Sequence, residues 1–182
     1  MLTADALHRI AKGDRDAFTE LYQRVQPRFV GYASALLAGD VDAALDVVDE
    51  AFLNIWREAG RYGGEGSADG WIRRIVRNKA VDWLRSRRER PEAPRGHHAF
   101  ELADPSDTPE RAAEKTSAAD ELRAALARLS PDHREVVWLC YFEERSLSEI
   151  AVIAGCPENT VKTRLFHARK QLRRELERQR AD

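Results

Sequence analysis

The sequence predicts an all-α protein made of two small helical domains that a flexible linker joins. Alternating patterns typical of half-buried strands are almost absent, whereas apolar residues recur at helical spacing over long stretches. Prolines and glycines interrupt residues 91–115, where little apolar material is available for a core. We therefore predict domains at 1–90 and 116–182, with a linker at 91–115 between them.

Length and composition limit the classes of protein that the chain can belong to. The 182 residues are 43% hydrophobic and 34% charged, which suits one or two small globular domains. No apolar run approaches the roughly 20 residues of a membrane-spanning helix, and the N-terminus, with its early Asp5, does not resemble a signal peptide. We expect a cytoplasmic protein without membrane insertion.

The first half is expected to form helices at 3–12, 14–37, 42–60 and 67–88. In the third of these, one face is apolar and should form the domain core; it carries Val41, Ala44, Leu45, Val48, Ala51, Phe52, Ile55 and Trp56. The opposite face carries Asp46, Asp49, Glu50, Leu53 and Arg57. A lone exposed leucine is common, but one among carboxylates indicates a surface that binds a partner.

The fourth expected helix and the loop before it are strongly basic, although the net charge of the whole chain is -1. The cationic and polar candidates for DNA contact are Arg61, Arg73, Arg74, Arg77, Asn78 and Arg85, with the aromatic Tyr62. Basic side chains beside Tyr62, Trp71 and Trp83 suit opened DNA, where phosphates are neutralised and unstacked bases meet aromatic rings. Alternatively, the tryptophans belong to the core and only the arginines meet solvent. We expect at least one of the tryptophans to be a core residue.

The second half is expected to form helices at 116–128, 131–143, 147–154 and from 157 to about 178, of which the last two make a helix-turn-helix. Ser146 and Glu149 have capping-box spacing, and Gly155 can adopt the positive φ that ends a helix. Cys156 and Pro157 then suit the N-cap and first position of the next helix.

The last helix has two faces. Its buried stripe is expected at Val161, Leu165, Ala168, Leu172 and Leu176, and its outer face carries Asn159, Lys162, Thr163, Phe166, His167 and Lys170. A helix that reads the major groove needs cations for phosphates, amide and hydroxyl groups for base edges, and an aromatic ring for a thymine methyl. A solvated packing helix is the alternative, which the capped turn makes less favoured.

Catalytic and metal sites are not indicated. Cys140 and Cys156 are too few and too far apart for a metal cluster, and they fit small buried or half-buried positions. The His97-His98 pair fits a solvated loop, and no lysine-threonine or lysine-serine pair follows the glycine-rich loop at 60–67. We expect no cofactor, no metal and no enzymatic activity.

Five motifs in order resemble the extracytoplasmic function (ECF, group IV) sigma factors of bacterial RNA polymerase. They are DAFTELY at 16–22, DVVDEAFLNIW at 46–56, WIRRIVRNKAVDWLR at 71–85, LSPDHREVV at 129–137 and TVKTRLFHARKQL at 160–172. The chain departs from the common pattern at Leu45, usually acidic, Asp49, usually glutamine, Lys79, usually apolar, and His167, frequently arginine.

The resemblance implies roles for these segments. The helix carrying Asp46, Asp49, Glu50 and Leu53 would dock on the β′ coiled coil of core RNA polymerase. The segment from Arg61 to about Arg88, with Asn78, would recognise and open the promoter −10 element. The helix-turn-helix would read the −35 element, the acidic linker would thread toward the polymerase active centre, and an anti-sigma factor would hold the protein inactive.

Two other functions compete with this interpretation. A helix-turn-helix regulator that is not a polymerase subunit would need a sensing domain, but the alternating strands and helices of a receiver domain are absent from the pattern. A helical adaptor that binds only proteins would leave two separated basic faces without a role.

Overall fold

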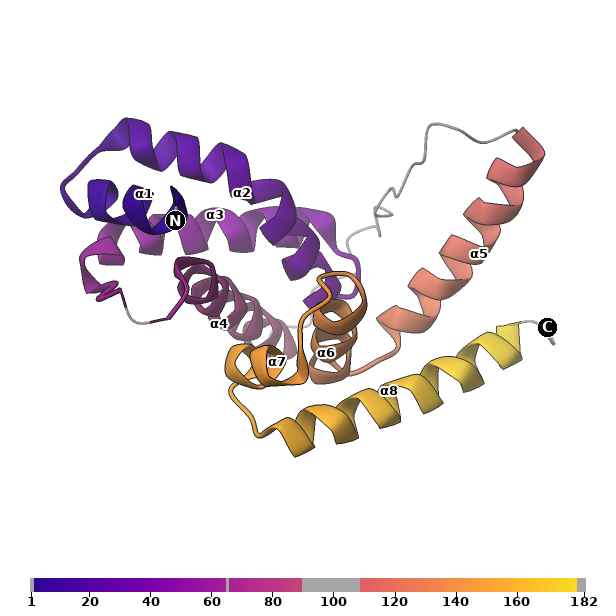
Figure 1. Ribbon diagram of the computed structural model, residues 1–182. Helices are drawn as coiled ribbons and strands as arrows, with labels where there is room; N and C mark the ends of the chain where they lie inside the picture. Colours follow the sequence, from indigo (N-terminus) through magenta and orange to yellow (C-terminus); the bar gives the residue numbers. More distant parts are fainter. Residues whose placement is uncertain (1, 65, 90–108, 180–182) are drawn as a thin grey trace. The chain divides into compact units, whose positions relative to one another are not determined.

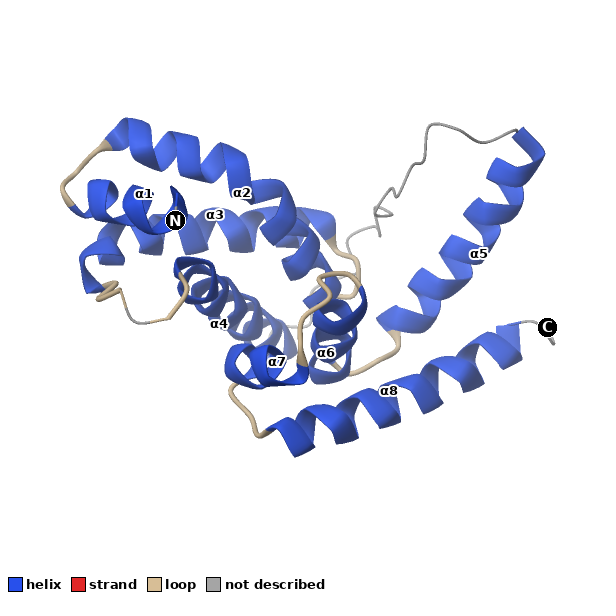
Figure 2. Cartoon of the chain, in the orientation of Figure 1, coloured by secondary structure: helices blue, strands red, loops and turns tan. Residues whose placement is uncertain are grey.

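The computed structural model describes residues 2–64, 66–89 and 109–179, which form two compact units, Met1–His98 and Ala99–Asp182. The helices run from α1 to α8 in chain order (Figure 1): α1 Leu2–Ala11, α2 Arg15–Leu36, α3 Val41–Glu58, α4 Ala68–Glu89, α5 Pro109–Ala127, α6 Pro131–Tyr141, α7 Leu147–Ala154 and α8 Glu158–Gln179, with a 3-10 turn η1 at Ala59–Arg61. No strand occurs within the described ranges (Figure 2), which confirms the predicted all-α class.

In the first unit, aspartates begin the two helices that enclose the core. Asp14 accepts a hydrogen bond from the amide of Ala17 at 2.9 Å and caps α2, and Asp40 does the same for Ala43 at 3.0 Å and caps α3. Phe52 of α3 lies at the centre of an aromatic cluster with rings of α2, those of Phe18, Tyr22 and Phe29. These contacts pack α3 along α2 (Figure 1).

The buried face of α3 differs from the expected one by a few residues. Ala44, Val48, Ala51, Phe52 and Ile55 are buried as predicted. Ala43 and Val47 are also buried, and Val41, Leu45 and Trp56 are only half-buried. The stripe is therefore centred slightly to one side of its predicted position, because α2 and α4 both pack against α3.

The second unit contains the helix-turn-helix that the sequence predicts. Ser146 and Glu149 form a reciprocal capping box at the start of α7, and Gly155 ends α7 with φ 63°. Helix α8 begins at Glu158, one residue later than expected, and the carbonyl of Pro157 accepts from the amide of Val161 at 3.1 Å. A core of α6, α7 and α8 side chains joins them, namely Leu139, Ile150, Val161, Leu165 and Ala168.

Helix α5 begins inside the segment predicted to be a linker. The expected start was residue 116, whereas the helix starts at Pro109. Proline disrupts a helix interior but suits the first turn, where its missing N–H costs no hydrogen bond, and the alanines and glutamates that follow are good helix formers. Residues 91–108 of the predicted linker, including His97-His98, lie outside the described residues, so the predicted domain limits stay predictions.

Among the helices described, none combines the length and the apolar composition that crossing a bilayer requires.

Candidate nucleic-acid and protein interfaces

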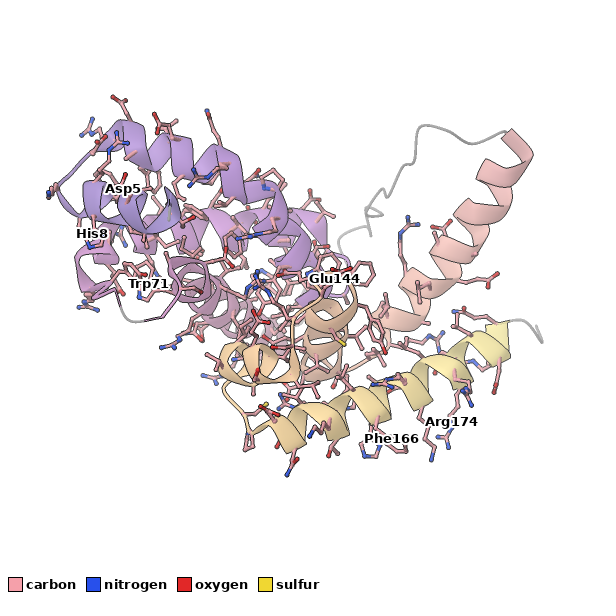
Figure 3. The ribbon with its side chains drawn as sticks, in the orientation of Figure 1. Asp5, His8, Trp71, Glu144, Phe166 and Arg174 are labelled. Carbon is pink, nitrogen blue, oxygen red and sulfur yellow. The ribbon has the colours of Figure 1, made fainter. Side chains whose placement is uncertain are left out.

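Helix α8 presents the whole face that the sequence assigned to DNA. Its six residues, Asn159, Lys162, Thr163, Phe166, His167 and Lys170, are all exposed. Phe166 is 62% exposed and projects from α8 away from α6 and α7 (Figure 3). Val161, Leu165 and Ala168 hold the opposite side of the helix in the core. A capped turn and a buried stripe thus leave a fixed polar and aromatic face in solvent.

Hydrogen bonding within α8 changes what Thr163 can offer a base. Its hydroxyl Oγ1 donates to the carbonyl oxygen of Asn159 at 2.9 Å, one turn earlier in the same helix. The γ-methyl group is therefore the part of Thr163 left for an apolar contact, and the thymine methyl is such a contact in the major groove. The ring of His167 lies edge-on to that of Phe166, with centroids 5.4 Å apart.

Arg164, which the sequence analysis did not single out, fastens the start of α8 to its neighbours. Its Nη2 lies 2.6 Å from Oδ2 of Asp132 at the start of α6, and its Nη1 donates to the sulfur of Cys156 at 3.7 Å. Burial, with the charges of His167 and Arg164, lowers the pKa of His133, which Asp132 raises in part. The beginning of α6 therefore lies close to the exposed face of α8 that carries His167.

The polar and basic residues that the sequence assigns to DNA in the first unit differ in their exposure. Arg61, Arg74, Asn78 and Arg85 are exposed and Arg77 is half-buried. Trp71 and Trp83 are both half-buried, so neither is the core residue that we expected at least one of them to be. The ring of Trp83 instead packs beneath the guanidinium of Arg87, at 4.8 Å.

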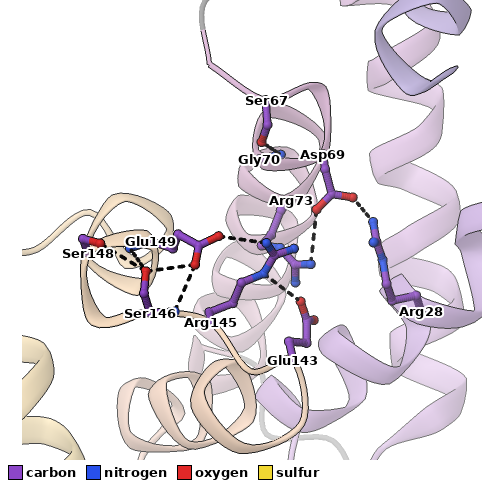
Figure 4. A network of polar contacts seen from close by, with 10 residues as sticks. All are labelled: Arg28, Ser67, Asp69, Gly70, Arg73, Glu143, Arg145, Ser146, Ser148 and Glu149. Atoms are coloured by element: carbon purple, nitrogen blue, oxygen red, sulfur yellow. Dashed lines mark hydrogen bonds and ion pairs between the residues drawn. The ribbon is translucent and has the colours of Figure 1, made fainter. Parts of the chain in front are cut away.

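Arg73 is the main correction to the predicted DNA-binding set, since its side chain is fully buried. Its guanidinium carbon lies 4.8 Å from the ring centre of Tyr32 and 5.4 Å from that of Phe29. Nη2 lies 3.5 Å from the carboxylate of Asp69, which also binds Arg28 (Figure 4). Arg73 therefore ties α4 to α2, and it does not face solvent.

Tyr62 is the second correction, because it is only 8% exposed. Its hydroxyl donates to the carbonyl oxygen of Gly66 at 3.1 Å, and its ring lies beside those of His8 and Trp71. These contacts hold the loop before α4. At the end of that loop, the hydroxyl of Ser67 accepts a hydrogen bond from the amide of Gly70 at 3.0 Å (Figure 4). Tyr62 shapes the loop and offers no free ring for stacking.

The outer face of α3 is exposed as predicted. Leu53 is 55% exposed, and the charged residues Asp46, Asp49, Glu50 and Arg57 surround it on the solvent side. Two of the carboxylates receive contacts that the sequence did not reveal. The hydroxyl of Tyr22 donates to Oδ1 of Asp49 at 2.6 Å, which raises the pKa of Tyr22, and Nζ of Lys79 lies 3.3 Å from Oε2 of Glu50.

These features define a class: an all-helical protein with an exposed leucine among carboxylates on one helix of the first unit, and a helix-turn-helix with an exposed polar and aromatic face in the second. Comparison with known proteins specifies the family. Residues 21–90 match the family model described as Sigma-70 region 2, and residues 119–172 match Sigma-70, region 4.

Curated relatives match over most of the chain. The ECF RNA polymerase sigma factor SigL of Mycobacterium tuberculosis is 36% identical over 146 residues, which are 78% of each chain. The RNA polymerase sigma-H factor of Pseudomonas aeruginosa is 29% identical over 181 residues, 94% of this chain and 92% of that one. The chain spans less of some relatives, 43% of the probable RNA polymerase sigma factor RfaY of Xanthomonas campestris, which is 35% identical.

A solved structure supports the same fold. The sigma factor RpoE in complex with the anti-sigma factor NepR from Bartonella quintana aligns with 88% of this chain and 96% of its own, with a TM-score of 0.68 and 23% identity. The chain belongs to the RNA polymerase sigma factors of the extracytoplasmic function type. It is therefore a promoter-recognising sigma factor and not a regulator that acts apart from the polymerase.

Proposed function

We propose that the chain binds core RNA polymerase through α3 and directs it to promoters through α4 and α8. The observation that carries this proposal is Leu53, a large apolar side chain 55% exposed among carboxylates, in a chain that also holds a capped helix-turn-helix. An apolar anchor ringed by charges is the pattern of a protein-docking surface, and the ring of charge supplies orientation.

On this proposal α4 engages the −10 element once the duplex opens. Its exposed Arg74, Asn78 and Arg85, with Arg61 in the turn before it, neutralise and hold the separated strand. The half-buried Arg77 lies between the exposed and buried sides of the helix. Arg73 and Tyr62 act differently, since they hold α4 and its preceding loop in place.

Helix α8 reads the −35 element as duplex DNA. Lys162 and Lys170 are the cations available to phosphates or guanine, and the ring of Phe166 and methyl of Thr163 are available to thymine methyl groups. Asn159 in the first turn and His167 beside Phe166 supply further polar groups.

Finer features of this proposal rest on the family. We assign the chain to group IV, place it in the cytoplasm where its polymerase works, and expect an anti-sigma factor to hold it inactive. The Bartonella sigma factor RpoE is in complex with such a factor, NepR. The acidic linker that we expect to enter the polymerase lies largely outside the described residues.

The test is reconstitution of promoter-specific initiation with the full chain and core RNA polymerase, together with the affinity of each variant for core enzyme. Leu53→Glu should weaken core binding by about 2 kcal/mol, roughly 30-fold, because it removes the anchor. The free energy of unfolding should change by no more than about 0.5 kcal/mol, because Leu53 is 55% exposed and lies opposite the buried stripe of α3.

Val152→Glu is the control for the added charge, since Val152 is 72% exposed on α7, in the other unit. It adds the same charge and should leave core binding unchanged. Normal core binding by Leu53→Glu, or a wild-type chain that initiates from no promoter with core enzyme, would overturn the proposed function.

A further inference from the structure

An ion pair between α3 and α4 occupies one carboxylate of the proposed docking face. Nζ of Lys79 lies 3.3 Å from Oε2 of Glu50 and satisfies both the distance of a salt bridge and that of a hydrogen bond. The Glu50 side chain is 66% exposed and that of Lys79 is 28% exposed. The carboxylate therefore faces solvent on the docking side, while the ammonium reaches it from the shielded side.

The neighbouring carboxylate is held in a different way. Asp49 accepts a hydrogen bond from the neutral hydroxyl of Tyr22 at 2.6 Å, so its position is restricted while its negative charge is kept. Glu50 is held by a cation, so its charge is largely cancelled at short range. Adjacent residues of one helix thus present one full and one neutralised carboxylate to a partner.

Neutralisation matters because of what the docking face should bind. Asp46, Asp49 and Glu50 give the face an acidic character, which is complementary to a basic surface. A cation on the partner can pair fully with Glu50 only by displacing Lys79 from it. A partly exposed ion pair contributes little to folding stability, so the domain stays folded when the pair breaks. The free energy of breaking it is nevertheless lost from the free energy of binding.

We propose that Lys79 is an intramolecular competitor for Glu50, which lowers the affinity of the α3 face for the basic surface of core polymerase. This inference rests on the proposed function, since it presupposes that α3 is the polymerase-binding face. Lys79 would set the strength of binding, and with it how readily this factor yields the polymerase to another sigma factor.

The test compares core-polymerase affinity of the full chain without DNA. Lys79→Met keeps an unbranched side chain and removes the ammonium, and it should tighten binding by about two- to fivefold. Lys79→Arg keeps the charge and should leave affinity unchanged. Lys12→Met is the control for net charge, because Lys12 is exposed in the same unit, and it should also leave affinity unchanged.

The specific evidence is a double-mutant cycle. In a Glu50→Gln background, where no carboxylate remains to be freed, Lys79→Met should have no effect on affinity. An equal gain in both backgrounds, or no gain from Lys79→Met in a chain that binds core enzyme, would overturn the competitor role and leave the proposed function standing. Absence of core binding by the wild type itself would overturn both.

Discussion

Helices α4 and α8 both carry the basic residues that the sequence assigns to DNA, but they present them differently. Every assigned residue of α8 is exposed, whereas α4 buries Arg73 completely and Arg77 in part. Around α4, helices α1, α2 and α3 all make contact, and Arg73 lies three residues before Val76 and seven before Ala80, on the same buried stripe. Position relative to the apolar stripe, more than charge, decides which arginine can meet DNA.

The comparison makes its strongest prediction at two adjacent arginines of α4. Arg73→Ala should lower the free energy of unfolding of the first unit by about 2–3 kcal/mol, because it leaves Asp69 without one cation and removes the contacts with Phe29 and Tyr32. Arg74→Ala, at an exposed site, should change it by no more than about 0.5 kcal/mol. Urea unfolding followed by circular dichroism measures both.

In DNA binding the order of the two effects should be reversed, with the larger direct effect at Arg74. Arg74→Ala should weaken capture of the opened −10 strand by holoenzyme, measured with single-stranded DNA at two salt concentrations. If Arg73→Ala leaves stability intact and Arg74→Ala unfolds the domain, our assignment of their faces is wrong.

On α8, Lys162→Ala should weaken −35 binding without affecting stability, since its side chain is exposed. If its contact is a phosphate, the slope of log affinity against log salt should fall by roughly 1; a guanine contact should instead cost about 1–3 kcal/mol at a single base pair. Holoenzyme binding to a panel of single-base promoter variants at several salt concentrations separates these results. Unchanged affinity and preference would show that this face does not read the groove.

Thr163 allows a smaller and more specific test, because its hydroxyl already bonds within the helix. Thr163→Val keeps a methyl at the same place and should preserve −35 preference, whereas Thr163→Ala should relax preference at one thymine by about 1 kcal/mol. The promoter panel used for Lys162 reports both. Loss of preference in Thr163→Val would mean that the hydroxyl itself reads a base.

The smallest expected effect is a pH dependence of stability at His133. Its pKa is lowered in the folded chain, chiefly by burial, so the unfolded chain binds a proton more readily. The stabilising contribution is therefore complete above the usual pKa of 6.5 and is lost as pH falls from there toward the lower folded pKa.

His133→Gln should reduce the fall in unfolding free energy between about pH 7.5 and pH 5.5, measured from urea midpoints at each pH. His167→Gln should have a smaller effect on this slope, because the charge of His167 lowers the pKa of His133 less than burial does. An unchanged pH slope in His133→Gln would place the titrating group elsewhere.

The sequence by itself determined the helices and most of the exposed faces that we assign to partners. Capping boxes, glycine C-caps and apolar stripes are local signals, which is why α7 was predicted with its observed limits and the reading face of α8 and outer face of α3 with all their members. Local signals were ambiguous at Pro109, because a proline that interrupts one helix also begins another.

Only the tertiary structure decided which charged and aromatic side chains are engaged in contacts with other helices. Tyr22 and Asp49 are 27 residues apart in sequence, and Glu50 and Lys79 are 29 apart. Helical periodicity relates residues within one helix, so it predicts neither contact. Tyr62 and Arg73 were lost from the DNA-binding set for the same reason: their rings and charge are taken up by partners on other helices. The sequence of a helix predicts which of its faces is apolar and which is polar, but the residues that contact each face depend on how the helices pack in the folded chain.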